Sequence, residues 1–275
     1  MTFSDLQLLH DWFTPFCAAY LSDADGEARC NYLLKEEHTR RVCQAAVTIA
    51  SGVGLTGEEL FLAESIALLH DVGRFPQYRK FRTFKDADSE NHAIRSVRVI
   101  SGEKLLAGLP QGERRLILRS VALHNIYRIP EQSDRREDFF LRLIRDADKL
   151  DIWRVFLDQY NIPPELRASA VGLGFPDTPS CSPELLVTIN EGKMINLSDV
   201  RTLNDLKLLQ LSWLFDLNFA PTVLLFRERG YLAAFAATLP SSGEIQGTLN
   251  FLESFLERAM HVDKSGESGD VAWTR

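Results

Sequence analysis

Apolar residues recur at helical spacing along nearly every long segment of the chain, whereas alternating strand patterns are scarce. One stripe consists of Val42, Ala45, Ala46 and Ile49. The run 60–69 has the composition of a buried helix, and Gly73 follows as a stop signal. This periodicity predicts an all-α protein with negligible β-sheet.

Capping and breaking residues divide the rest of the chain into further helices. Helices are expected at about 91–102 after Ser89 as N-cap, and at 113–126, 138–157, 203–219, 221–239 and 245–260. A stretch rich in proline and glycine, 161–183, has loop chemistry. We therefore expect a helical core over residues 1–160, a helical extension over 161–262 packed on that core, and a flexible polar tail over 263–275.

Charge and cysteine content restrict the partners and the compartment. The formal net charge of −7 over 275 residues argues against a general affinity for nucleic acid or an anionic membrane. The four cysteines form no CxxC pair, which fits a reducing cytoplasm. The amino-terminal sequence has no secretion signal, and the apolar run 213–226 is interrupted by Asp216 and Asn218. We expect a cytoplasmic protein with neither nucleic acid nor membrane as a partner.

The histidines are distributed in an informative way. The chain has only six, and four of them lie in apolar helical segments of its first half: His38, His70, His92 and His124. His70 is followed by Asp71 at the end of an apolar helix, where burying a carboxylate beside an imidazole is costly unless a cation compensates the charge. A lone histidine on an apolar stripe is usually a core residue, but four together favour a metal site. Imidazole and carboxylate ligands suit Mn, Fe, Co, Ni or Zn.

Three of these positions, with a later aspartate, resemble a known signature. His38, the pair His70-Asp71, and Asp148 within 146–151 are similar to the H…HD…D pattern of the HD-domain superfamily of metal-dependent phosphohydrolases, over roughly residues 30–160. The resemblance implies a helical bundle whose metal ligands converge from separate helices. This agrees with the all-α fold expected from the periodicity.

Asp146 competes with Asp148 for the final ligand position. The two residues are two apart on a predicted helix, so they point to nearly opposite sides. Asp148 lies on the apolar stripe formed by Leu141, Ile144, Ile152 and Val155. We favour Asp148, and the alternative is that Asp148 forms a buried salt bridge while Asp146 binds the metal.

His92 and His124 extend the pattern to H…HD…H…H…D, which resembles the HD proteins that bind two metal ions bridged by the aspartate of the HD pair. The resemblance implies one ion on His38, His70, Asp71 and Asp148, and a second on Asp71, His92 and His124. Asp71 is then the bridging residue at the catalytic centre. In the alternative, a single ion binds and His92 and His124 contact the substrate phosphate.

Phosphate-ester hydrolysis by a metal-activated water is the function that this site favours. Neither a GxSxG nucleophile motif nor a GxxxxGK[ST] loop is present. A basic segment follows the HD pair and is expected to form a loop beside the metals: Arg74, Arg79, Lys80, Arg82 and Lys85. Arg74 and Lys80, together with Lys149, are candidates to bind substrate phosphate, and the alternative is a solvated basic loop.

Two other functions are consistent with the same residues. The six-residue pattern is also similar to that of diiron HD-type oxygenases, which two irons and oxygen consumption would reveal. The other is a non-catalytic regulatory HD module, which would bind nucleotide without turnover. The expected substrate is a small phosphorylated molecule, with nucleotides among the candidates. A cyclic dinucleotide is disfavoured, because Arg74-Phe75-Pro76 stands where a Gly-Tyr-Pro signature would be expected.

Overall fold

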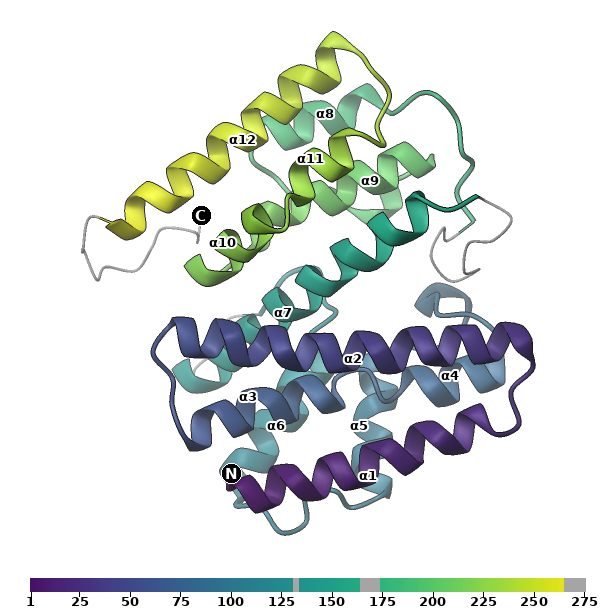
Figure 1. Ribbon diagram of the computed structural model, residues 1–275, viewed down its shortest axis with the longest axis vertical. Coiled ribbons are helices and arrows are strands. Elements are labelled where there is room, and N and C mark those ends of the chain that lie inside the picture. The colour runs from purple at the N-terminus through teal and green to yellow at the C-terminus, as the bar shows by residue number, and fades with distance from the viewer. Residues whose placement is uncertain (131–133, 164–173, 265–275) are drawn as a thin grey trace. The chain divides into compact units, whose positions relative to one another are not determined.

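The computed structural model describes residues 1–130, 134–163 and 174–264, and over these residues it contains helices and no strand (Figure 1). The all-α prediction is confirmed. None of the described helices is both long and apolar enough to cross a membrane. Residues 164–173 of the proline- and glycine-rich stretch and nearly all of the predicted flexible tail lie outside the described residues.

The chain divides into two compact units, the first over residues 1–152 and the second beginning at Trp153. Helices of the first unit are α1 Phe3–Leu21, α2 Gly26–Gly52, α3 Glu58–Leu69, α4 Arg74–Phe81, η1 Asp86–Asp88, α5 His92–Gly102, α6 Gln111–Leu123 and the start of α7 Arg135–Tyr160. Within it, α2 packs on α3, α1 contacts both, and α5 packs on α6 (Figure 1). The short α4 contacts α2 and α5. The domain boundary at 160 and the packing of the extension remain predictions.

Side-chain caps define where several helices begin. The α1 helix starts with a capping box in which Thr2 and Asp5 bond each other's backbone N–H groups. The α5 helix is capped by Asn91, whose Oδ1 accepts from the N–H of Ile94 at 3.0 Å. The prediction of Ser89 as this cap was wrong, because the Ser89 hydroxyl instead donates to the Lys85 carbonyl at 2.8 Å.

The basic segment after the HD pair was predicted as a loop, but residues 74–81 form the helix α4. Pro76 is tolerated because it is the third residue of this helix, where a backbone N–H has no intrahelical acceptor. The helix ends at Arg82, which caps it in the left-handed conformation with φ 57°. Helical geometry therefore places Arg74, Arg79 and Lys80 on different sides of α4, while Arg82 and Lys85 follow the helix.

In the second unit, the side chain of Trp153 is buried among the helices. Its elements after α7 are α8 Pro183–Asn190, η3 Leu197–Asp199, α9 Leu203–Ser212, η4 Trp213–Asp216, α10 Ala220–Glu228, α11 Tyr231–Ala236 and α12 Gly243–Lys264. The Trp153 ring packs against Phe226 with centroids 4.6 Å apart, and its indole N–H donates to the Gln210 carbonyl at 2.9 Å. The predicted helix 221–239 is divided in two at Gly230, which has a φ of 63°.

Gly73 lies at the closest approach between the HD turn and α5. A Cβ at this position would be 2.4 Å from both the His92 carbonyl oxygen and the Ser96 backbone nitrogen. The N–H of Gly73 also donates to the Ser96 hydroxyl at 2.8 Å. The two main chains thus approach each other directly at the Cα of Gly73, and the Ser96 hydroxyl bonds to the turn beside this contact.

We predict that Gly73→Ala lowers the free energy of unfolding by about 2 kcal/mol, because the added methyl must push two backbone segments apart. Urea unfolding of both proteins measures the change. Gly112→Ala is the matched control, since its Cβ would meet nothing within 4 Å. Equal stability of the two variants would contradict this account of the close approach.

Candidate metal centre

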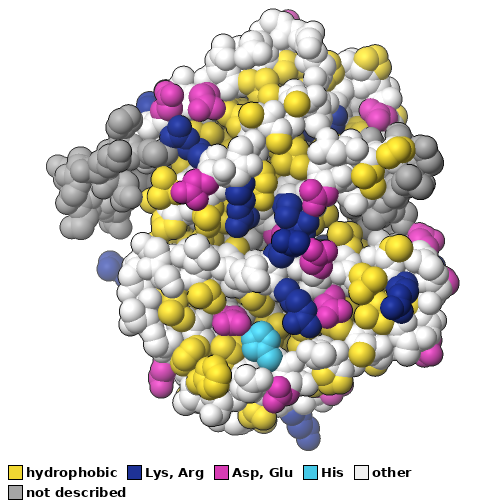
Figure 2. Space-filling model, in the orientation of Figure 1, with side chains coloured by type: hydrophobic (Ala, Val, Ile, Leu, Met, Phe, Trp, Pro, Cys, Tyr) yellow, Lys and Arg dark blue, Asp and Glu magenta, His cyan; other side chains and the backbone are white. Residues whose placement is uncertain are grey.

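The six predicted ligands are brought together from five parts of the first unit. His38 lies on α2, His70 and Asp71 directly follow α3, His92 begins α5, His124 directly follows α6, and Asp148 lies on α7. All four histidines and Asp71 are buried, and the side chain of Asp148 is 15% exposed. Little histidine surface is accordingly visible on the face shown in Figure 2.

Two of the histidines are oriented by the ends of their own helices. His70 and His124 cap the C-termini of α3 and α6. The Nδ1 of His70 lies 2.6 Å from the Ala67 carbonyl oxygen, and that of His124 lies 2.8 Å from the Val121 carbonyl oxygen. Carbonyls in the last turn of a helix need such a donor. Each contact turns the opposite ring nitrogen, Nε2, toward the cluster.

Carboxylates orient the other two histidines. The Nδ1 of His38 lies 2.8 Å from Asp151 Oδ2, and the Nδ1 of His92 lies 2.7 Å from Asp86 Oδ2. An oxygen acceptor at Nδ1 fixes the proton there and leaves the Nε2 lone pair available to a metal ion. All four Nε2 atoms therefore face the interior of the cluster.

One set of ligand atoms surrounds the Oδ2 side of Asp71. Asp148 Oδ1 lies 3.1 Å from His38 Nε2 and 3.6 Å from His70 Nε2. Asp71 Oδ2 lies 3.7 and 3.8 Å from the same two nitrogens. Ligands bound at about 2.1 Å from one ion are about 3.0 to 3.4 Å apart, so these separations suit a shared ion after small adjustment.

A second set surrounds the other oxygen of the same carboxylate. Asp71 Oδ1 lies 3.4 Å from His92 Nε2 and 3.9 Å from His124 Nε2. The two imidazole nitrogens are 3.1 Å apart. Asp71 therefore presents one oxygen to each set, an arrangement compatible with the predicted bridging role.

The unmet bonding capacity of this cluster fits a divalent cation. Four of its buried atoms have no hydrogen-bond partner: His38 Nε2, His70 Nε2, Asp71 Oδ1 and Asp148 Oδ1. In addition, the Nε2 atoms of His92 and His124 face each other while each Nδ1 lies against an oxygen acceptor. Buried lone pairs and charges without partners are costly, and a metal ion would satisfy them.

The pKa shifts place most of these groups in the protonation states that bind metals. Burial and the neighbouring His92 and His70 lower the pKa of His124 to about 3. Burial raises the pKa of Asp71, but Lys35, His70 and Arg74 outweigh it and hold that pKa well below the usual range. Neutral imidazole and ionised carboxylate are the ligating forms.

His38 behaves differently from the other histidines. Burial and Lys35 lower its pKa, but the adjacent carboxylates of Asp148 and Asp151 outweigh them and raise it. Its imidazole thus holds a proton more readily when no ion is present, and binding of an ion at Nε2 would release that proton.

Distances within the cluster distinguish Asp148 from Asp146, the two candidates for the final ligand position. Asp148 Oδ1 lies within reach of two histidines, and Asp148 belongs to a group with His70 and His124 whose ligand atoms are all within 4.8 Å of one another. Asp146 is buried but belongs to no such group among the described residues. The geometry favours Asp148 as the ligand.

The predicted substrate-binding cations lie at unequal distances from the cluster. Arg74 Nε lies 3.5 Å from Asp71 Oδ1, and its Nη2 lies 3.3 Å from His92 Nε2. Lys80 is exposed, with its ammonium 4.6 Å from the centroid of the Phe81 ring. Lys149 is buried on α7 next to Asp148. Arg74 thus lies directly against two of the predicted ligands.

Three residues that contact the cluster are not among the site residues predicted from the sequence. Lys35 donates to Asp71 Oδ2 at 2.8 Å, and Asp151 and Asp86 accept from His38 and His92. Lys35 and Asp151 each lie three residues from a predicted ligand on the same helix, and this spacing could have identified them. Asp86 lies in the short η1 turn, where no periodicity marks it.

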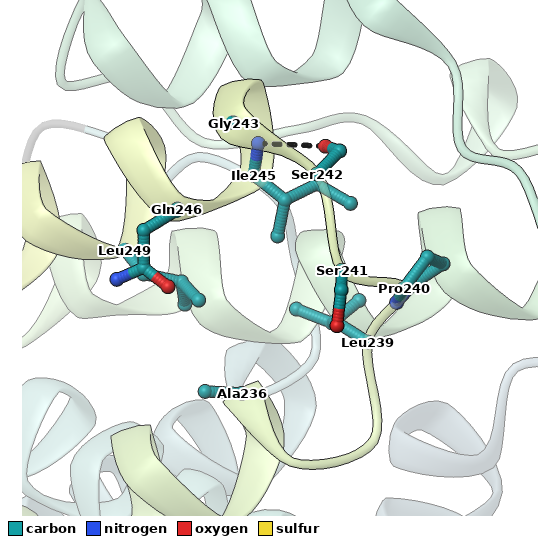
Figure 3. Close-up of a pocket in the computed structure, with 9 residues that line it drawn as sticks. All are labelled: Ala236, Leu239, Pro240, Ser241, Ser242, Gly243, Ile245, Gln246 and Leu249. Carbon is teal, nitrogen blue, oxygen red and sulfur yellow. Dashed lines mark hydrogen bonds between the residues drawn. The ribbon is translucent and has the colours of Figure 1, made fainter.

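The second unit contains a pocket of different chemistry. It has a volume of about 410 Å³ and is lined by residues near the start of α12, including Ser241, Ser242 and Gln246 (Figure 3). The Ser242 hydroxyl accepts from the N–H of Ile245 at 3.2 Å. None of its lining residues is acidic, basic or a cysteine, so this pocket offers no ligand set for a metal.

Comparison with protein families agrees with the geometry. Residues 36–153 match the family model of the HD domain, and all six predicted ligands fall within the match. No curated protein and no solved structure shows significant similarity to the chain. The resemblance inferred from the sequence is confirmed: this segment is an HD domain, with a histidine and aspartate cluster compatible with divalent metal.

We predict that Asp71→Ala loses both ions, because each of its oxygens faces a different ligand set, whereas His92→Ala loses chiefly one. Metal-to-protein ratios of the purified variants measure this. Asp11→Ala, an exposed aspartate on α1, is the control and should retain the wild-type ratio. Equal loss in Asp71→Ala and His92→Ala would instead indicate one cooperative site.

Proposed function

We propose that the protein is a metal-dependent phosphohydrolase that cleaves a phosphate ester of a small substrate, with nucleotides among the candidates. One observation carries the proposal: the two oxygens of the buried Asp71 face two separate ligand sets. The family match supports it, because HD domains are generally metal-dependent phosphohydrolases.

Each ligand residue has a distinct task in this proposal. His38, His70 and Asp148 would hold one divalent ion with Asp71, and His92 and His124 would hold the other with the same carboxylate. When bound, such ions acidify a water for attack on phosphorus and neutralise the phosphoryl oxygens. Asp151 and Asp86 keep the imidazole rings of His38 and His92 oriented. The protein then needs no nucleophile of its own.

Two cations beside Asp71 are suited to hold the phosphate. Lys35 contacts Asp71 Oδ2 and Arg74 approaches Oδ1, and their side chains are 16% and 14% exposed. If divalent ions take over the neutralisation of Asp71, these two positive charges become available to an anionic substrate. Guanidinium and ammonium groups both bind phosphate oxygens. We therefore add Lys35 to the predicted substrate contacts Arg74, Lys80 and Lys149.

The function is tested by metal analysis of the purified protein, followed by assays on phosphate monoesters and nucleotides with added Mn²⁺ or Co²⁺. Metal-stimulated release of phosphate is the expected result. Oxygen consumption by a protein with two irons and no phosphate release would overturn the proposal in favour of an oxygenase. A metal-free protein that binds nucleotide without turnover would indicate a regulatory module.

We predict that Arg74→Ala and Lys35→Ala keep the wild-type metal content but lower kcat/KM on phosphate esters by about tenfold to a hundredfold, because each removes a cation beside the reacting group. Steady-state kinetics and metal ratios measure both effects. Arg98→Ala is the matched control, since Arg98 is 65% exposed on α5 and pairs with Glu90. If Arg74→Ala and Lys35→Ala are fully active, Lys80 and Lys149 become the substrate-binding candidates to test.

A further inference from the structure

Asp86 accepts hydrogen bonds from four side chains of the first unit. His92 Nδ1 lies 2.7 Å from its Oδ2, and Gln77 Nε2 lies 2.9 Å from its Oδ1. Arg74 Nη1 donates to Oδ1 at 3.1 Å, and Asn125 Nδ2 donates to Oδ2 at 3.2 Å. The donors come from α4, from α5 and from the segment after α6, so this one carboxylate joins three parts of the fold.

We propose that Asp86 is a positioning residue that couples the second ion to the substrate-binding arginine, by orienting His92 with one bond and Arg74 with another. The coupling to substrate rests on the proposed function, whereas the effect on ion binding does not. Asp86 is not itself a ligand in this proposal, because its oxygens are already occupied by side-chain donors.

The bond to His92 determines where its lone pair points. With the proton held at Nδ1 by Asp86, the Nε2 of His92 lies 3.4 Å from Asp71 Oδ1 and 3.1 Å from His124 Nε2. His124 is held by a backbone carbonyl, which no side-chain substitution removes. A change at Asp86 therefore acts on one histidine of the second set and leaves the other in place.

The bond to Arg74 fixes one branch of its guanidinium. Nη1 donates to Asp86, to Gln77 Oε1 at 3.0 Å and to the Phe84 carbonyl. This leaves Nε and Nη2 on the side that faces Asp71 and His92. The Gln77 amide also donates to the Ser89 hydroxyl and the Glu90 carbonyl, both at 2.8 Å, which holds the turn that carries Asp86.

The test compares Mn²⁺ binding by wild type, Asp86→Ala and Arg74→Ala, with inorganic phosphate as the probe of the anion site. Asp86→Ala should weaken binding of one ion by about tenfold to a hundredfold, keep the other ion, and weaken phosphate binding. Arg74→Ala should weaken phosphate binding and keep both ions. A variant that carries both Asp86→Ala and Arg74→Ala should lose less phosphate-binding free energy than the sum of the two single losses, because both changes disrupt the same interaction.

Asp88→Ala is the matched control, since Asp88 lies exposed in the same η1 turn and pairs with Lys85 at 3.1 Å. It should bind both ions like wild type. If Asp86→Ala fails to fold, the isosteric Asp86→Asn carries the test, because a neutral amide oxygen is a weaker acceptor for His92. Its expected effect is a smaller loss of affinity, again for one ion only.

Wild-type affinity for both ions in Asp86→Ala or in folded Asp86→Asn would overturn the proposal. Equal weakening of both ions, or the same weakening in Asp88→Ala, would also overturn it, because a collapsed turn would then explain the effect. If wild type cleaves no phosphate ester while Asp86→Ala still loses one ion, the proposed function fails and the positioning of His92 stands.

Discussion

The structure of the first unit depends on how the charge of one buried carboxylate is compensated. Asp71 is 2% exposed, and ionised groups at such depth are costly unless several partners share the charge. Lys35, Arg74 and the surrounding histidines supply those partners. Because they come from α2, α4 and α5 and from the ends of α3 and α6, the helices must meet at this point for the carboxylate to be tolerated.

Two kinds of hydrogen-bond acceptor fix the orientation of the four histidine rings. His70 and His124 bond to carbonyls of the last turns of α3 and α6, so their orientation follows from helix termination itself. His38 and His92 depend on the carboxylates of other segments. Helix ends therefore do two things at once: they satisfy backbone groups that would otherwise lack partners, and they aim imidazole nitrogens inward.

The fold class followed from local pattern, because helical periodicity is a property of neighbouring residues. The convergence of the ligands followed instead from the resemblance of His38, His70-Asp71 and Asp148 to the HD signature. Features that depend on distant contacts did not follow. Asp86 acquires its role only when the η1 turn meets α4 and α5. The break at Gly230 has a local cause, because a left-handed glycine after the charged residues 227–229 ends the helix there. The segment 74–81 resembles a loop in sequence because it contains Pro76, but a proline in the first turn of a helix is compatible with helix formation.

The main-chain contact at Gly73 limits how the site can change over evolution. The turn after Asp71 touches the backbone of α5 at Gly73, where the Ser96 hydroxyl also bonds to the turn. A larger residue at position 73 would therefore push the turn that carries Asp71 away from the helix that carries His92. Changes in the chemistry of such a centre are therefore expected at the residues around the ligands, which are Asp86, Asp151, Lys35 and Arg74. The separation of the two ligand sets is expected to stay the same.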